Sequence, residues 1–318
     1  MKIISCYKEL QSDNLIAGGI GQGGGGYWQN VVGIKLQSCL AEILKAKLHL
    51  CSRPHGRDSF DRTDYEPLKG AYDIAYCQLF EVPKVRPADW IYSIISDYIS
   101  MEAVLEDFLS RAKPDLIISF QYPLNPPSGK PNLIEQCARH GCEVVFMPWF
   151  NEQNQPVYKV ERNITAMCTG KMGGTYPFRD KAYKYLESLN RSDIALSGNP
   201  NGSTFRLSDE QYQDSMRRCK YYISGGIYDI QIPPKYYEVC NYGCCLISPE
   251  LPMMKEAGFI DGETYIKVNN AEEIPDILAS DRWVEIGRAA QKMVHKYHGI
   301  RARAKDIAKM WFLSRKGK

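Results

Sequence analysis

Residues 217–262 read RRCKYYISGGIYDIQIPPKYYEVCNYGCCLISPELPMMKEAGFIDG and hold most of the information on the architecture. An apolar run precedes a glycine turn, a short helix, a second apolar run and a loop that contains several acids. Pro233 and Pro234 suit the start of the helix, because a proline in the first turn loses no hydrogen bond. Gly243 suits the position just after its end. The segment is therefore predicted to form a strand–helix–strand unit.

The same segment has the features of an anion site. A helix N-terminus that faces the Gly225–Gly226 turn attracts negative charge. Lys235 and Glu238 lie three positions apart, on one face of the helix. A carboxylate at that place can accept hydrogen bonds from sugar hydroxyls, so the pattern predicts a pocket for a nucleotide-sugar. The plainer alternative is that Glu238 only pairs with Lys235 or Lys255.

The rest of the chain alternates apolar runs with amphipathic stretches, which is typical of βαβ units and parallel sheets. Its 318 residues suit two α/β domains. A polar segment with two prolines at 148–162 indicates the connection between them. We expect domains at 1–155 and 156–295, followed by a basic C-terminal helix at 296–318. Strands are expected at 2–6, 47–51, 72–76, 115–120, 143–147, 163–169 and 193–197, and helices at 27–46, 89–112, 130–140, 178–190, 208–218 and 282–314.

Composition narrows the classes of protein. The net charge of +3 is too small to indicate nucleic acid, and no run of about 18 apolar residues is present to cross a membrane. Eleven scattered cysteines fit a reducing compartment better than a disulfide framework. Neither they nor the isolated histidines have the spacing of a metal site. We expect a cytoplasmic protein with no metal and no cofactor.

Two further glycine-rich segments point to phosphate chemistry. The run GGIGQGGGG at 18–26 precedes an amphipathic stretch. It contains G-x-G-x-x-G, but about a dozen residues separate it from the first strand, which argues against a dinucleotide site. In TGKMGGTYPFRD at 169–180, a strand ends in glycine and a lysine follows. Arg179 falls in the first turn of the helix that follows, where it could bind a phosphate. The plainer alternative is that Arg179 is an ordinary surface arginine.

Residues 163–290 resemble the C-terminal half of family-1-like GT-B glycosyltransferases, particularly the CgeB-like branch. The likeness rests on the P-x-K-x-x-E-like run, the GCCLIS strand and the Tyr176-x-x-Arg179 pattern. It implies two Rossmann-like domains with parallel sheets facing across a cleft, and a C-terminal helix that crosses back to the first domain on Trp311 and Phe312. It further implies transfer of a sugar from a nucleotide-sugar to a hydroxyl acceptor, a glycan or glycoconjugate, without a metal.

The resemblance assigns roles to particular residues. Glu238 would hold the ribose and Lys171 would face the diphosphate. Retaining members carry another glutamate where this chain has Ile230, with Asp229 beside it. The predicted donor-binding residues are Gly170, Lys171, Tyr176, Arg179, Gly225, Gly226, Tyr228, Pro233, Pro234, Lys235 and Glu238, and the predicted cleft loop is Gly23, Gly24, Gly25 and Gly26.

No catalytic base stands out from the sequence. The candidates are His55, Asp58, Asp61, Glu152 and Asp229. The basic tail leaves open a contact with an anionic surface, either the inner face of a membrane or nucleic acid. The alternatives are therefore a phage-type DNA glycosyltransferase and a non-catalytic protein that binds nucleotide-sugars or glycans. An NADP-dependent oxidoreductase is the most distant alternative.

Overall fold

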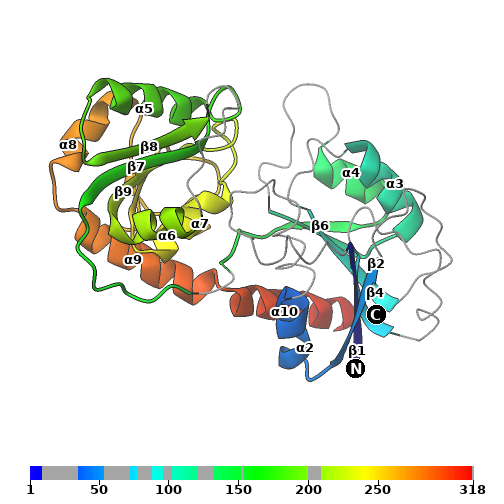
Figure 1. Cartoon of the computed structure of the whole chain (residues 1–318). Coiled ribbons are helices and arrows are strands. Elements are labelled where there is room, and N and C mark those ends of the chain that lie inside the picture. Colours follow the sequence, from blue (N-terminus) through cyan, green and yellow to red (C-terminus); the bar gives the residue numbers. More distant parts are fainter. Residues whose placement is uncertain are drawn as a thin grey trace. The chain divides into compact units, whose positions relative to one another are not determined.

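The computed structural model describes residues 1–8, 35–53, 72–77, 88–95, 102–120, 132–151, 154–199 and 209–316. The chain divides into two compact units (Figure 1). Unit 1 comprises Met1–Pro148 and the C-terminal residues Ile300–Lys318, and unit 2 comprises Trp149–Gly299. Within the described residues, no helix combines the length and the apolar character that crossing a membrane would require.

Unit 1 contains a six-stranded parallel sheet in the order β2-β1-β3-β4-β5-β6. Its strands are β1 (Lys2–Lys8), β2 (Lys47–Arg53), β3 (Tyr72–Cys77), β4 (Ala88–Ile95), β5 (Leu116–Ser119) and β6 (Glu143–Phe146). Its described helices are α2 (Gln37–Ile43), α3 (Glu102–Ala112), α4 (Leu133–Arg139) and α10 (Ile300–Lys316).

Unit 2 contains a five-stranded parallel sheet in the order β11-β10-β9-β7-β8. Its strands are β7 (Ile164–Lys171), β8 (Ile194–Asn199), β9 (Cys219–Ile223), β10 (Cys245–Ser248) and β11 (Ile266–Lys267). Its helices are α5 (Pro177–Ser188), α6 (Asp209–Arg218), α7 (Pro234–Asn241), α8 (Ile274–Leu278) and α9 (Trp283–Tyr297), with a short 3₁₀ helix, η4 (Ala271–Glu273), before α8.

Each sheet has one place where the winding reverses. The first strand of unit 2, β7, lies between β8 and β9. The first strand of unit 1, β1, lies between β2 and β3. Open α/β sheets bind ligands outside the carboxyl ends of the strands at such a reversal. In unit 1 the segments that follow β1 and β3, including Gly23–Gly26, lie outside the described residues.

The predicted helix at 89–112 is wrong over its first part. Residues Ala88–Ile95 form β4, which pairs in parallel with β3 and β5, and only Glu102–Ala112 is helical. Ile91, Tyr92 and Ser93 are all fully buried. A strand covered on both faces is a continuous apolar run, and periodicity alone does not separate such a run from a buried helix.

The helical tail at 282–314 is confirmed as two helices, α9 and α10, separated at His298 and Gly299. Nε2 of the buried His298 lies 2.9 Å from the carbonyl oxygen of Ala257. Trp311 is buried, but Phe312 is 51% exposed. Of the two predicted anchors of the last helix, only Trp311 therefore packs inward.

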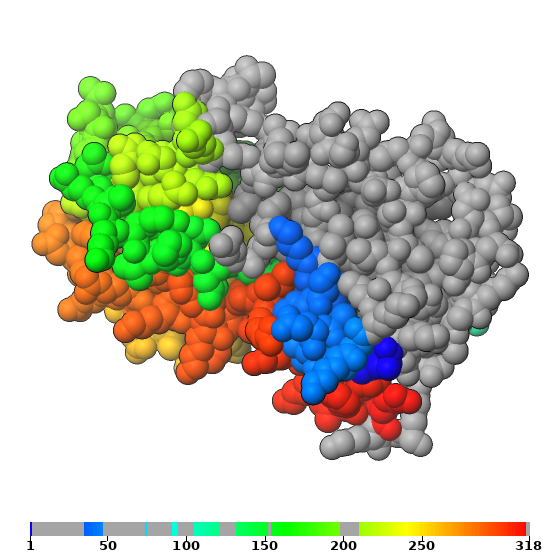
Figure 2. Space-filling model, turned by 60° about the horizontal axis from the view of Figure 1, so that its bottom comes forward, coloured from blue at the N-terminus to red at the C-terminus, as the bar shows by residue number. Residues whose placement is uncertain are grey.

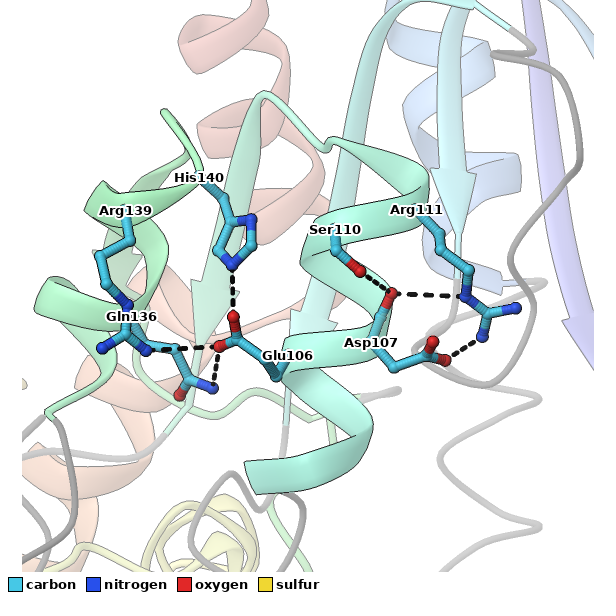
Figure 3. A network of polar contacts seen from close by, with 7 residues as sticks. All are labelled: Glu106, Asp107, Ser110, Arg111, Gln136, Arg139 and His140. Atoms are coloured by element: carbon cyan, nitrogen blue, oxygen red, sulfur yellow. Dashed lines mark hydrogen bonds and ion pairs between the residues drawn. The ribbon is translucent and has the colours of Figure 1, made fainter.

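A polar network joins α3 to α4 in unit 1 (Figure 3). The Glu106 carboxylate accepts hydrogen bonds from Gln136 at 3.0 Å and from Arg139 at 3.4 Å, and it lies 2.6 Å from Nε2 of His140. These hydrogen bonds, first from Gln136 and then from His140, lower the pKa of Glu106 below its ordinary value. The network therefore favours an ionised Glu106.

The two ends of unit 2 lie side by side. Asn151 and Gly299 form a parallel bridge, and the backbone N–H of Asn151 donates to the carbonyl of His298 at 2.8 Å. The side-chain amide of Asn151 also donates to the carbonyl of Tyr237 at 3.1 Å. Both ends of the unit are thereby fixed at one place.

Candidate functional site

Arg179 lies where the winding of unit 2 reverses, at the carboxyl ends of β7 and β9. Pro177 occupies the first turn of α5 and places Arg179 two residues into the helix. The guanidinium donates to the carbonyl of Lys171 at 3.2 Å and to the hydroxyl of Ser224 at 3.0 Å. It also lies 4.0 Å from the centre of the Tyr176 ring. These contacts hold a cation at the edge of the sheet that the topology marks for ligands.

The charge of Arg179 is buried and has no counter-ion among the described residues. Arg179 is 4% exposed. No ion pair in the described part of the chain includes this arginine. Its Nε makes no hydrogen bond there. A buried charge without a partner is costly. Guanidinium groups bind phosphate oxygens well, so an anionic ligand is the natural partner for this cation.

Glycines allow the close packing around Arg179. Gly170 has a φ of +113°, and a Cβ there would lie 3.2 Å from Nη1 of Arg179. A Cβ on Gly225 would lie 3.0 Å from the Cβ of Phe178. A Cβ on Gly226 would lie 2.7 Å from Leu251. Gly170 and Gly225 therefore let the segments after β7 and β9 approach α5, and Gly226 lets the segment after β10 approach the segment after β9.

A strained turn supports the start of α5. Tyr228 and Asp229 have φ values of 52° and 53°, which non-glycine residues rarely adopt. The backbone N–H of Tyr228 donates to the carbonyl of Thr175 at 2.7 Å, and Asp229 accepts from the N–H of Phe178 at 3.4 Å. Burial raises the pKa of Asp229. This catalytic candidate thus faces the N-terminus of α5.

Gln231 closes the same turn and is 1% exposed. Its backbone exchanges hydrogen bonds with Ile227. Neither its side-chain nitrogen nor its side-chain oxygen makes a hydrogen bond with any residue that the structure describes. A buried amide of this kind requires an explanation, and a bound ligand is one.

Lys235 and Glu238 form a buried ion pair on α7, with 2.9 Å between Nζ and Oε2. Nζ also donates to the Tyr212 hydroxyl at 2.6 Å and lies 4.3 Å from the centre of its ring. Burial alone would lower the pKa of Lys235, but Glu238 raises it above its ordinary value. Burial, and then Glu238, raise the pKa of Tyr212. The helix begins at Pro234 with Pro233 as its N-cap, as predicted from the sequence.

A cavity of about 550 Å³ opens at the carboxyl ends of β10 and β11. Leu251 forms part of its wall and lies against Gly226, so the cavity adjoins the segment between β9 and α7. Glu250 and Lys267 line it and form an ion pair with each other. The other lining residues are Pro249, Pro252, Val268 and Asn269.

The structure brings together part of the predicted donor set. Arg179, Tyr176, Gly225 and the carbonyl of Lys171 meet at one place, whereas the side chain of Lys171 is exposed. Ser224, Tyr212 and Gln231 were not predicted. Of these three residues, only Ser224 could have been found from the sequence, because it directly follows an apolar run that predicts a buried strand. His55, Asp58, Asp61 and Glu152 lie outside the described residues. Among the described residues, no three His, Cys, Asp or Glu side chains gather as metal ligands.

Comparison with known proteins supports the architecture. No protein-family model matches the chain, and no curated protein matches it in sequence. Among solved structures, it resembles sucrose-phosphate synthase from Thermosynechococcus elongatus, with a TM-score of 0.56 and 12% identity over 100% of both chains. It also resembles Anabaena HepE in complex with UDP and glucose, with a TM-score of 0.52 and 11% identity over 98% of this chain and 99% of the other.

A glycosyltransferase from Rickettsia africae is similar at a TM-score of 0.51 and 12% identity, over 98% of this chain and 97% of that one. Together with two parallel sheets of Rossmann-like winding, these likenesses define a GT-B fold. The predicted fold class, GT-B with two Rossmann-like parallel sheets, is therefore confirmed. At such identities the comparison establishes the fold alone.

Proposed function

We propose that the chain is a glycosyltransferase that moves a sugar from a nucleotide-sugar to a hydroxyl acceptor, a glycan or glycoconjugate, without a metal. The observation that carries this proposal is the buried cation of Arg179, which lacks a counter-ion among the described residues. It lies at the winding reversal of unit 2, in a fold shared with HepE bound to UDP and glucose.

In the proposed reaction, Arg179 binds the diphosphate of the donor. Transfer of the sugar leaves negative charge on the departing diphosphate, and a fixed guanidinium stabilises that charge. Glu238 holds the ribose, and the neighbouring Lys235 fixes the carboxylate. The cavity beside Leu251 receives another part of the donor. We further propose that the chain belongs to the CgeB-like branch, which residues 163–290 resemble.

Donor binding is tested with purified protein and a panel of UDP-, GDP-, CMP- and dTDP-sugars. We expect one nucleotide family to raise the melting temperature, because a ligand that binds only the folded state stabilises it. Slow hydrolysis of the same donor would separate an enzyme from a protein that only binds. If no nucleotide raises the melting temperature, the proposal fails.

The role of Arg179 is tested by Arg179→Met, which we expect to weaken binding of the nucleoside diphosphate by at least about tenfold. Arg179→Lys keeps the charge but loses the paired hydrogen-bond donors of the guanidinium. Its affinity for the nucleoside diphosphate should lie between those of the wild type and Arg179→Met. The matched control is Arg191→Met, which removes an exposed arginine of the same unit that pairs with Asp193. Equal affinities in the Arg179→Met and Arg191→Met variants would refute the assignment.

A further inference from the structure

The outward face of α10 carries a stripe of cations. Arg301, Lys305 and Lys309 recur every four residues and are all exposed. The opposite face is buried in unit 1 through Ala304, Ile307, Ala308 and Trp311. Figure 2 shows α10 (red) at the surface, next to α2 (blue). The stripe is therefore available to a partner.

Among the described residues, little negative charge offsets this stripe. Asp306 is the one acid of α10, and it accepts from the buried Arg303 at 2.7 Å. Glu42 on α2 pairs with Arg301 at 2.9 Å. Lys305 and Lys309 form no ion pair with any residue that the structure describes. The exposed Lys45 lies just after α2 and adds to the positive charge.

Two large apolar side chains continue the stripe. Phe312 is 51% exposed and Leu313 is 57% exposed, one turn beyond Lys309. Arg315 follows on the same side, with its guanidinium 5.2 Å from the centre of the Trp311 ring. Cations next to exposed apolar side chains on one helix are typical of helices that lie in the surface of a bilayer. A polyanion such as DNA would be attracted by the lysines but would leave Phe312 and Leu313 in water.

We propose that this face of α10 docks unit 1 on an anionic lipid bilayer. Lys305 and Lys309 lie against the headgroup phosphates, and Phe312 and Leu313 enter the boundary of the acyl chains. The inference is independent of the proposed transferase activity, because none of these residues belongs to the site at Arg179.

Co-sedimentation with vesicles tests this proposal. We expect the full chain to partition onto phosphatidylcholine vesicles that contain phosphatidylglycerol, and much less onto phosphatidylcholine alone. Lys305→Glu with Lys309→Glu should lower partitioning at least about twentyfold, since each cation near such a surface contributes roughly 1 kcal/mol. Phe312→Ser with Leu313→Ser should also lower it, and most strongly at high salt, where attraction between charges is screened.

The matched control is Lys255→Glu with Lys292→Glu, which makes the same change in net charge at two exposed lysines of unit 2. The control should partition like the wild type. Circular dichroism verifies that each variant is folded. Three outcomes overturn the proposal: no preference for anionic vesicles, equal losses in the α10 and control variants, or binding to duplex DNA without binding to vesicles.

Discussion

The buried ion pair between Lys235 and Glu238 leads to a prediction about the stability of unit 2. Their side chains are 18% and 7% exposed, so removing one partner leaves the other charge in a poorly solvated place. We predict that Lys235→Met costs about 3 kcal/mol of unfolding free energy, and that Glu238→Gln costs a similar amount. The double variant should cost clearly less than the sum, because it leaves no orphaned charge. Urea denaturation of the four proteins measures this, and additive losses would contradict it.

Gly287 on α9 gives a second prediction at the scale of one residue. A Cβ at this position would overlap the carbonyl oxygen of Gly243, which belongs to the backbone and has little room to move. Alanine favours a helix by about 1 kcal/mol over glycine. We nevertheless predict that Gly287→Ala destabilises unit 2 by about 1–3 kcal/mol through overpacking.

Gly174→Ala is the control for this substitution. A Cβ on Gly174 would meet no atom within 4 Å, and the φ of this glycine lies outside the left-handed region, so the change should be close to neutral. Thermal melts of both variants decide the matter, and a more stable Gly287→Ala protein would show that α9 can shift away from Gly243.

The sequence predicted several residues of the candidate site, but not all of the contacts between them. The position of Arg179 in the first turn of a helix can be predicted from Pro177 and the preceding glycines. Its burial cannot, because that depends on Ser224 and Gly225, more than 40 residues later in the chain. The pairing of Lys235 with Glu238 was the plainer alternative from the sequence, and the structure contains that pair.

At the scale of elements, the contact between α3 and α4 depends on the charge of Glu106. Its pKa is lowered in the folded state, so its contribution to stability is complete above the ordinary carboxyl range and is lost as the pH falls. The carboxylate is partly exposed, so we expect a contribution below about 1 kcal/mol. The melting temperature of Glu106→Gln should lie below that of the wild type at neutral pH, and the gap should close between about pH 5 and 3.

The control for this prediction is Glu143→Gln. Glu143 is exposed and forms no ion pair with any residue that the structure describes. Its variant should follow the wild-type melting temperature at every pH. A gap for Glu106→Gln that stays constant down to pH 3 would mean that shape, and not charge, joins the two helices.

Helices were predictable where proline marks their start in the sequence. Pro177 and the Pro233–Pro234 pair mark helix starts, and α5 and α7 begin beside them. No glycine or proline separates β4 from α3, so the mainly apolar sequence of the strand runs into that of the helix. The turn at Tyr228 and Asp229 had no clear local signal either, because glycine, asparagine or aspartate, and not tyrosine, would be the expected residue at position 228.

At the scale of the whole molecule, unit 2 is one continuous stretch of chain, whereas unit 1 needs α10 as well as its first 148 residues. We predict that a fragment of residues 149–299 folds on its own, with a cooperative thermal transition. A fragment of residues 1–148 should not, because it lacks the buried face of α10. Circular dichroism melts of both fragments test this, and a cooperative transition in the 1–148 fragment would show that α10 is dispensable.

The alternation of strands and helices was sufficient to predict two parallel sheets, since βαβ units impose that arrangement. The return of the last helix to unit 1 came from the family resemblance, because no local pattern states where a terminal helix packs.

The bridge between Asn151 and Gly299 also has an evolutionary meaning. A unit whose two ends meet can behave as an insert in the rest of the chain. Its exchange for another unit requires only two new junctions, which lie next to each other in space. A chimera that carries a different unit between residues 148 and 300 would leave the sheet of unit 1 and helix α10 unchanged. Such modular exchange offers a direct route by which one lineage replaces unit 2 as a whole while keeping unit 1.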